Sequence, residues 1–199
     1  MTRIKICGLT RREDIQAVNE AMPDYGGFVF AESRRQVDMK QAAALREGLD
    51  PGISAVGVFV NAPIKDIEEI CRNGIIDHVQ LHGEETAEYI RRLREKISLP
   101  IIKAVSMNEN VTQQQLEAID ADYLLLDQGK GGTGKTFDWG LIPNLKTPFF
   151  LAGGLDPFNL KDAVRRVRPY AADLSSGVET DGKKDREKIL QAVRSIRNE

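Results

Sequence analysis

Short apolar runs alternate with longer amphipathic segments along the whole chain. The runs, rich in Val, Ile, Leu and Phe, have the length of buried strands, and the segments between them have helical spacing. This alternation predicts repeated strand–helix units. The predicted strands are Arg3–Cys7, Tyr25–Phe30, Ile53–Val60, His78–Leu81, Pro100–Val105, Tyr123–Asp127, Pro148–Ala152 and Ala171–Leu174. The predicted helices are Arg11–Ala21, Met39–Glu47, Ile64–Arg72, Glu84–Lys96, Val111–Ile119, Pro157–Val167 and Arg186–Arg197.

Two of these helices have clear start signals. Thr10 is a candidate N-cap, and Glu13 three residues later completes a capping box. Asp156 and Pro157 place a cap and a proline at the first position of the helix after the seventh strand. Both starts are predicted at these residues.

The predicted strands favour a closed barrel over an open sheet. Residues 55–60, AVGVFV, form a continuous apolar run, which is typical of a parallel strand covered on both faces. A doubly wound sheet is the structural alternative, but eight strands with short crossovers favour an α/β fold of the (β/α)8 type, a TIM barrel. The glycine-rich segment Gly129 to Asp138 and Pro143 predict that the outer helix after the sixth strand is reduced.

Composition narrows the class further. The 199 residues are 41% hydrophobic and 29% charged, which predicts one compact globular domain over residues 1–199. Lys and Arg total 28 against 30 Asp and Glu, so the basic excess that binds nucleic acid is missing. Two cysteines cannot form a disulfide framework, and no apolar run approaches membrane-spanning length. We expect a soluble cytoplasmic protein without nucleic-acid or membrane partners.

Polar side chains end three of the predicted strands. Cys7 closes the first strand before Gly8, Asp127 closes the sixth, and Asp173 lies in the eighth. Because barrel sites form at the carboxyl ends of the strands, these groups are expected on one rim. A free cysteine is often only a small buried hydrophobe, and an aspartate after a strand is often a cap, so both interpretations stay open. Without a metal-ligand cluster, the set favours acid–base chemistry.

Glycines and hydroxyls follow the last two strands. Gly153 and Gly154 come after the seventh strand, and Ser175, Ser176 and Gly177 come after the eighth. Barrels commonly bind phosphate at these loops through backbone N–H groups, although each cluster alone is also ordinary turn chemistry. Their joint position predicts a phosphorylated small-molecule substrate.

Four further residues are candidates of lower specificity. Arg34 and Arg35 follow the second strand, where either could bind a substrate carboxylate, although adjacent arginines are often simply solvated. His78 and His82 stand at the two ends of the fourth strand and do not share a helical face as a zinc pair does. We expect His82 at the rim and His78 in a structural position.

The loop Gly129–Thr136, GKGGTGKT, matches the phosphate-loop pattern G-x-x-x-x-G-K-[ST]. That pattern binds nucleotides only where a helix begins at its Lys-Thr end. Here the chain reaches Pro143 seven residues after Thr136, which leaves no room for such a helix. We therefore do not expect ATP or GTP hydrolysis.

Six motifs together carry a family resemblance. They are Lys5-Ile6-Cys7-Gly8-Leu9-Thr10, Gly57-Val58-Phe59-Val60-Asn61, Gln80-Leu81-His82-Gly83, Gly131-Gly132-Thr133-Gly134, Leu151-Ala152-Gly153-Gly154-Leu155 and Asp173-Leu174-Ser175-Ser176-Gly177-Val178-Glu179. In this order and spacing, over essentially the whole chain, they closely resemble the phosphoribosylanthranilate isomerase family.

The resemblance implies the Amadori rearrangement of N-(5-phosphoribosyl)anthranilate in tryptophan biosynthesis, without cofactor or metal. By this likeness Asp127 is the general acid that protonates the furanose ring oxygen, and Cys7 is the base that removes the C2 proton. An acid must hold its proton and a base must lose it, so we expect a raised pKa for Asp127 and a lowered one for Cys7. Arg35 takes the position that holds the anthranilate carboxylate, and His82 and Asp173 are further substrate-binding candidates.

The chain departs from the family pattern at two places. Arg34 replaces the proline before Arg35, and the segment Glu179–Asp185 is one residue shorter and lacks a proline. We expect that segment to border the phosphate rather than the acid and base. The loop Gly129–Thr136 becomes a glycine-rich cover over the site, and Lys135 becomes incidental.

Two alternative functions stay open. Some barrels of this type also isomerise the aminoimidazole carboxamide ribotide of histidine biosynthesis, usually with two aspartates, which Cys7 argues against. The other alternative is a barrel that binds phosphate or nucleotide without catalysis. The oligomeric state is expected to be a monomer or a homodimer.

Overall fold

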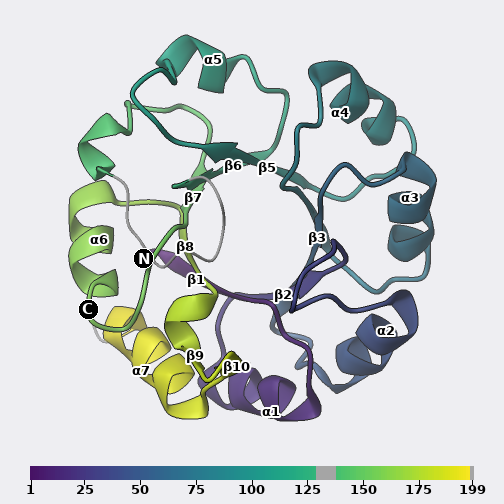
Figure 1. The fold of residues 1–199 in the computed structure, drawn as a ribbon, viewed down its shortest axis with the longest axis vertical. Helices are drawn as coiled ribbons and strands as arrows, with labels where there is room; N and C mark the ends of the chain where they lie inside the picture. The colour runs from purple at the N-terminus through teal and green to yellow at the C-terminus, as the bar shows by residue number, and fades with distance from the viewer. Residues whose placement is uncertain (129–137, 198–199) are drawn as a thin grey trace.

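The computed structural model, described here for residues 1–128 and 138–197, is a closed parallel barrel ringed by helices (Figure 1). Its strands pair in chain order, and β8 closes against β1. The strands are β1 (Arg3–Cys7), β2 (Tyr25–Val29), β3 (Ser54–Phe59), β4 (His78–Leu81), β5 (Ile101–Ser106), β6 (Tyr123–Asp127), β7 (Phe149–Leu151) and β8 (Ala171–Leu174). The predicted (β/α)8 fold is confirmed, and each strand end that differs from the prediction is shifted by one residue.

Helices follow most strands and cover the outside of the barrel (Figure 1). They are α1 (Arg12–Ala21), α2 (Met39–Gly48), α3 (Ile64–Arg72), α4 (Ala87–Arg94), α5 (Gln113–Glu117), α6 (Leu160–Val167) and α7 (Arg186–Arg197). Between β6 and β7 the described residues form only a 3-10 turn, η1 (Trp139–Leu141), so the reduced outer helix is confirmed. The predicted cover over residues 129–136 lies outside the described residues.

Both predicted helix starts need correction. At α1 the capping carboxylate is Asp14, whose Oδ2 accepts hydrogen bonds from the backbone N–H groups of Thr10 and Arg11 at 2.9 and 3.0 Å. Glu13 points to solvent, because the carboxylate one residue later has the geometry to reach back. Helix α6 begins at Leu160, three residues after Pro157. The Asp156 carboxylate caps the turn before it instead, accepting from the N–H of Phe158 at 2.8 Å.

Alternation along each strand separates an inner and an outer core. On β1, Ile4 and Ile6 pack outward with the helices, while Lys5 and Cys7 alternate with them and point into the barrel. The inner core at the amino-terminal end is aromatic, with Tyr25, Tyr123, Phe150 and Tyr170 in mutual ring contact. Among the described residues this layer fills the barrel at that end, which leaves the carboxyl ends of the strands for a cleft.

No helix among the described residues has the length and apolar character to cross a lipid bilayer. The longest, α7, has 12 residues and packs against α1 and α6 on the outside of the barrel. Its buried residues Ile189, Ala192, Val193 and Ile196 belong to the outer core.

Candidate active site

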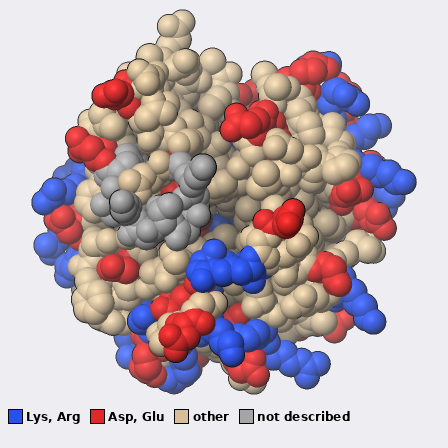
Figure 2. Space-filling model, viewed as in Figure 1, with Lys and Arg blue, Asp and Glu red and all other residues tan. Residues whose placement is uncertain are grey.

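A cleft of about 340 Å³ opens at the carboxyl ends of the strands. All of the predicted site residues except Gly177 line it: Cys7, Arg35, His82, Asp127, Gly153, Gly154, Asp173, Ser175 and Ser176. Gly177 lies just behind, where a Cβ would collide with the carbonyl oxygen of Leu155. Arg34 does not line the cleft. In Figure 2, basic side chains gather just below the centre of this face, over β1 and β2.

Cys7 sits at the end of β1 in space created by glycine. It is 8% exposed, and its partner across the strand pair is Gly27. A Cβ at Gly27 would lie 2.8 Å from the Cys7 sulfur, so a side chain there would displace the thiol. The chain turns immediately after Cys7 because Gly8 adopts a φ of +86°, which few other residues tolerate. The thiol is thus held at the floor of the cleft.

The ionisation of Cys7 differs from the expected direction. Burial raises the pKa of the thiol above its ordinary value, and the positive charges of Lys5 and Lys184 offset this only in part. The expected lowered pKa is therefore wrong for the protein without substrate. Two buried ammonium groups nevertheless lie where they favour the thiolate.

Asp127 ends β6 opposite Cys7, with β7 and β8 between them in the barrel. Its Oδ1 accepts a hydrogen bond from the N–H of Gln128 at 2.7 Å, and its Oδ2 lies 3.6 Å from Nε2 of His82. The other ring nitrogen, Nδ1, is 2.8 Å from the amide nitrogen of Gln80. When Gln80 donates there, a neutral His82 carries its proton on Nε2, facing Asp127. Gln80 is a cleft residue that the sequence analysis missed.

His78 lies at the opposite end of β4, as predicted. Its ring meets Tyr25 edge-on at a centroid distance of 5.3 Å and belongs to the aromatic layer. Burial lowers its pKa below the ordinary value. His78 is therefore remote from the cleft.

Asp173 forms a buried ion pair with Lys5, a residue that the sequence analysis did not single out. Lys5 donates to both carboxylate oxygens of Asp173 at 3.0 Å, and its side chain has no exposed surface. The two residues are direct neighbours on β1 and β8. The available signal was a lysine between two isoleucines in the first strand, two residues before Cys7.

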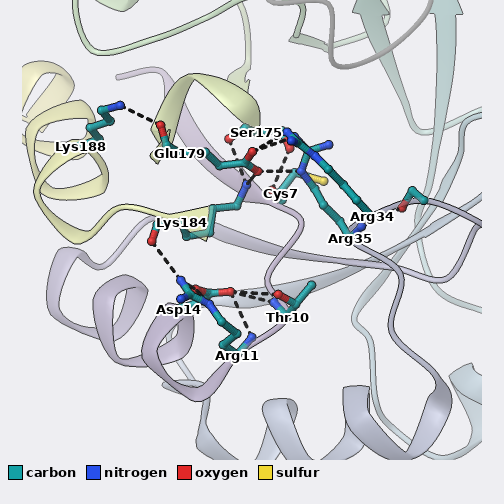
Figure 3. Close-up of polar contacts among 11 residues, drawn as sticks. Cys7, Thr10, Arg11, Asp14, Arg34, Arg35, Ser175, Glu179, Lys184 and Lys188 are labelled. Carbon is teal, nitrogen blue, oxygen red and sulfur yellow. Dashed lines mark hydrogen bonds and ion pairs between the residues drawn. The ribbon is translucent and has the colours of Figure 1, made fainter. Parts of the chain in front are cut away.

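Glu179 joins the loop after β2 to the segment after β8 (Figure 3). It begins the two-residue strand β9 (Glu179–Thr180), which pairs with β10 (Lys183–Lys184). Its carboxylate accepts from Nε and Nη2 of Arg35 at 2.6 and 3.0 Å, from Arg34 at 2.7 Å and from Lys184 at 2.6 Å. Lys184 also donates to the carbonyl of Ser175, whose hydroxyl donates to the carbonyl of Cys7.

This arrangement corrects the expectation that the segment Glu179–Asp185 borders only the phosphate. Glu179 contacts Arg35, and the charge of Lys184 reaches Cys7. Burial would raise the pKa of Glu179, but hydrogen bonds from Arg35 and Lys184 outweigh it and hold the pKa below its ordinary value. Burial lowers the pKa of Lys184, against the opposing effect of Glu179.

The glycine and serine loops after β7 and β8 lie side by side at the cleft. Gly153 and Gly154 have φ values of +88° and +65°, and the side-chain amide of Asn159 donates to the carbonyl of Gly154 at 2.8 Å. Gly177, in the 3-10 turn η2 (Ser176–Val178), packs against the backbone of Leu155. Contact between the two loops places both predicted phosphate-binding clusters at one end of the cleft.

The fold and the cleft together define a (β/α)8-barrel enzyme with acid–base groups at the carboxyl ends of its strands. The family model for N-(5'phosphoribosyl)anthranilate (PRA) isomerase matches residues 4–195. The chain belongs to this family of isomerases, which acts in tryptophan biosynthesis.

Individual relatives are similar to this chain in sequence or structure over their full length. The N-(5'-phosphoribosyl)anthranilate isomerase of Endomicrobium trichonymphae is 48% identical over 202 residues, covering 100% of both chains. A solved monomeric form of the dimeric Thermotoga maritima enzyme is 36% identical with a TM-score of 0.87, covering 100% of both chains. A phosphoribosyl anthranilate isomerase solved with reduced 1-(o-carboxyphenylamino)-1-deoxyribulose 5-phosphate is 34% identical with a TM-score of 0.84, also covering 100% of both.

Proposed function

We propose that this chain converts N-(5-phosphoribosyl)anthranilate into 1-(2-carboxyphenylamino)-1-deoxyribulose 5-phosphate, with Asp127 as general acid and Cys7 as general base. The observation that carries this assignment is the placement of one thiol and one carboxylate on the same cleft, at the ends of β1 and β6. Acid–base catalysis by two groups on either side of a substrate is the chemistry that such a pair performs.

The proposed reaction proceeds in two proton transfers. Asp127 gives its proton to the furanose ring oxygen, the bond from C1 to that oxygen breaks, and the nitrogen lone pair forms the Schiff base. The Cys7 thiolate then takes the C2 proton, and the resulting enolamine becomes the ketone as C1 gains a proton and the C2 hydroxyl loses one. The proton lost by Asp127 balances the one gained by Cys7, so the reaction is a net isomerisation.

The remaining cleft residues are proposed to bind the three polar parts of the substrate. Arg35 binds the anthranilate carboxylate, since it is the arginine that lines the cleft. His82 and Asp173 contact the ribose hydroxyls. The loops that contain Gly153, Gly154, Ser175, Ser176 and Gly177 bind the phosphate.

Two substitutions and one control test this proposal. Cys7→Ala and Asp127→Asn are each expected to abolish turnover, followed by the loss of substrate fluorescence, while circular dichroism shows an intact fold. Cys71→Ala is the matched control, because Cys71 is a half-buried thiol on α3, outside the cleft. Near-normal turnover by Cys7→Ala or Asp127→Asn would overturn the assigned roles.

The substrate range has its own test. We propose that the chain acts on the tryptophan precursor alone, because a thiol occupies the first catalytic position. Turnover of aminoimidazole carboxamide ribotide at a comparable rate would contradict this, and tight ATP binding without isomerase activity would favour a non-catalytic barrel.

We also propose that residues 1–199 act as one barrel domain in the cytoplasm, as a monomer or a homodimer. Strand pairing from β1 to β8 in one closed barrel supports the single domain. The Thermotoga maritima relative is described as dimeric, which supports the homodimer as one of the two proposed states.

A further inference from the structure

Lys5 is a charged side chain inside the barrel for which the proposed reaction has no role. It lies in the middle of β1, two residues before Cys7 on the same inward face, with no exposed surface. It does not line the cleft, so it is not a substrate contact. Burying a charge is costly, and apolar residues of similar volume often replace a buried ion pair without loss of stability, so stability alone does not explain a lysine at this position.

The charge state of Lys5 follows from its partners. Burial alone would lower its pKa, but the charge of the Asp173 carboxylate, together with that of the Cys7 thiolate when it forms, outweighs burial, and the pKa stays above its ordinary value. Both oxygens of Asp173 accept hydrogen bonds from the Lys5 ammonium at 3.0 Å, which fixes the ammonium in place. The doubly hydrogen-bonded ion pair therefore holds Lys5 in its charged form.

Charged groups surround the Cys7 thiol on several sides. Lys5 and Asp173 lie below it and Lys184 lies beside it, while Arg35, His82 and Asp127 line the cleft around it. The Glu179 carboxylate forms ion pairs with Arg35 and Lys184 and so offsets part of their positive charge. Glu32 is exposed to solvent at the edge of the cleft. Among the cations near the thiol, Lys5 lies on the same inward face of β1 two residues before it, and its charge opposes the effect of burial most strongly.

We propose that Lys5 is a positioning residue for the base: its buried ammonium, held beneath Cys7 by Asp173, stabilises the thiolate that accepts the substrate proton. On ionisation the thiol proton leaves to solvent through the cleft, and Lys5 keeps its own proton throughout. This inference rests on the proposed role of Cys7 as base, and adds the group that makes the thiol ionisable in a buried position.

The test measures thiol ionisation directly, without substrate. In a Cys71→Ala background Cys7 is the only thiol, and its titration is followed by thiolate ultraviolet absorbance and by the pH dependence of iodoacetamide alkylation. Lys5→Met is expected to raise the pKa of Cys7 and slow alkylation near neutral pH by about tenfold or more, since one pKa unit changes the thiolate fraction tenfold. In Asp173→Asn the amide oxygen still accepts a hydrogen bond from Lys5, but the negative charge that raises the pKa of Cys7 is lost, so this variant is expected to act in the opposite direction and speed alkylation.

Opposite shifts of the Cys7 pKa in Lys5→Met and Asp173→Asn distinguish the proposed role of Lys5 from a purely structural one. If the ion pair only fills the barrel, Lys5→Met and Asp173→Asn loosen the same contact, and they shift the titration in the same direction or leave it unchanged. Either result overturns the inference. Should Lys5→Met fail to fold with Asp173 unpaired, the double variant Lys5→Met/Asp173→Asn removes both charges. Its alkylation is still expected to be slower than that of the background protein, because the effect of Lys5 exceeds that of Asp173.

Lys103→Met is the matched control. Lys103 is another buried barrel lysine paired with a carboxylate, Glu85, at 2.9 Å, but it alternates with the inward-facing Ile102 and Ala104 and points away from the thiol. Its loss is expected to lower stability without moving the titration of Cys7. The inference and the proposed function can fail separately. Retained turnover in Cys7→Ala would contradict the proposed function, whereas an unchanged Cys7 pKa in folded Lys5→Met would contradict only the role of Lys5.

Discussion

Glu179 binds the guanidinium of Arg35 through both carboxylate oxygens, at 2.6 and 3.0 Å. The contact uses Nε and Nη2, and the described residues offer no hydrogen-bond partner to Nη1. The Arg35 side chain also packs over Gly8, where a Cβ would collide with it. Glu179 thus holds one edge of the Arg35 guanidinium, and packing over Gly8 holds the aliphatic part of the side chain. The edge of the guanidinium that includes Nη1 is left to bind a carboxylate in the cleft.

This geometry predicts unequal effects at the two adjacent arginines. Arg35→Ala is expected to raise KM by roughly 10- to 100-fold, because a charge-assisted hydrogen bond to substrate contributes about 1.5–3 kcal/mol. Arg34→Ala is expected to change KM by less than about threefold, since its side chain is 56% exposed and its one ion pair among the described residues is with Glu179. Steady-state kinetics of both variants decide the matter, and equal effects would contradict the assignment.

Glu179→Gln tests the same contact from the other side. The amide keeps the shape of the carboxylate but loses its charge, so Arg35 is held less firmly and KM is expected to rise by about tenfold. Because the two residues act as a unit, the double variant Glu179→Gln/Arg35→Ala is expected to resemble Arg35→Ala alone. Additive effects on KM would mean that Glu179 acts independently of Arg35.

The contact between Arg35 and Glu179 is one that could not be predicted from the sequence. Arg35 and Glu179 are 144 residues apart, and they meet because β1 lies between β2 and β8 in the closed barrel. The strands could be predicted because each is a compact apolar run, and Cys7, Asp127 and Asp173 could be placed on one rim because each lies at or near a strand end. Contacts between loops depend on barrel closure, so neither Glu179 nor Lys184 could be placed beside Cys7.

Lys5 and the first helix cap were missed for different reasons. A lysine inside a strand resembles a solvent-facing position, and only the pairing of Lys5 with Asp173 across β1 and β8 shows that it is buried. The cap of α1 was assigned to Glu13 by spacing, but the carboxylate that reaches Thr10 belongs to Asp14. Such one-residue differences depend on backbone geometry that spacing does not contain.

The buried pair of Glu85 and Lys103 predicts sensitivity to acid. Burial would raise the pKa of Glu85, but hydrogen bonds from the N–H of Asn61 and from Lys103 outweigh it, so the folded pKa lies below 4.5. A lowered carboxyl pKa gives stability that is present above the unfolded pKa and lost as pH falls through the folded one. We therefore expect the wild-type free energy of unfolding to fall as pH drops below about 4.5.

Glu85→Gln provides the comparison, with urea unfolding measured from about pH 7 to about pH 3. The variant is expected to be about 3–5 kcal/mol less stable near neutrality, because it leaves the Lys103 ammonium buried without a counter-charge. The two stability curves should approach each other in acid, where the wild-type carboxylate is protonated. Curves that stay parallel would mean that another group causes the acid loss.

Gly27 creates the space for the Cys7 thiol, which predicts a functional role for a residue without a side chain. In Gly27→Ala the Cβ would lie 2.8 Å from the sulfur and 3.0 Å from Cα of Cys7, so the thiol must move. Overpacking of this kind costs about 1–3 kcal/mol, and a shift of the base by about 1 Å is expected to lower kcat by about 100-fold.

Gly48→Ala is the control for Gly27→Ala. At the end of α2 a Cβ would meet Ile15 at 3.5 Å, an ordinary contact, and alanine is the better helix former. We expect unchanged kcat and a stability gain of roughly 0.5 kcal/mol. If Gly27→Ala keeps wild-type kcat, the thiol tolerates displacement and its close packing has no catalytic importance.

Gly153 makes the corresponding prediction for the acid. Its φ of +88° is costly for alanine, and a Cβ there would lie 2.8 Å from Oδ1 of Asp127 and 3.1 Å from the nitrogen of Gln128. Those are the two atoms that form the hydrogen bond orienting the carboxylate. Gly153→Ala is therefore expected to lose about 1–3 kcal/mol of stability through backbone strain and, separately, about 100-fold in kcat through displacement of the acid.

Gly74→Ala separates the two effects. Gly74 follows α3 with a φ of +66°, and a Cβ there would meet nothing within 4 Å. This variant carries the same kind of backbone strain far from the cleft, so it is expected to lose stability while kcat stays unchanged. Thermal unfolding and steady-state kinetics of the two variants measure both quantities. A loss of kcat in Gly74→Ala as large as in Gly153→Ala would show that general destabilisation, rather than the contact with Asp127, reduces turnover.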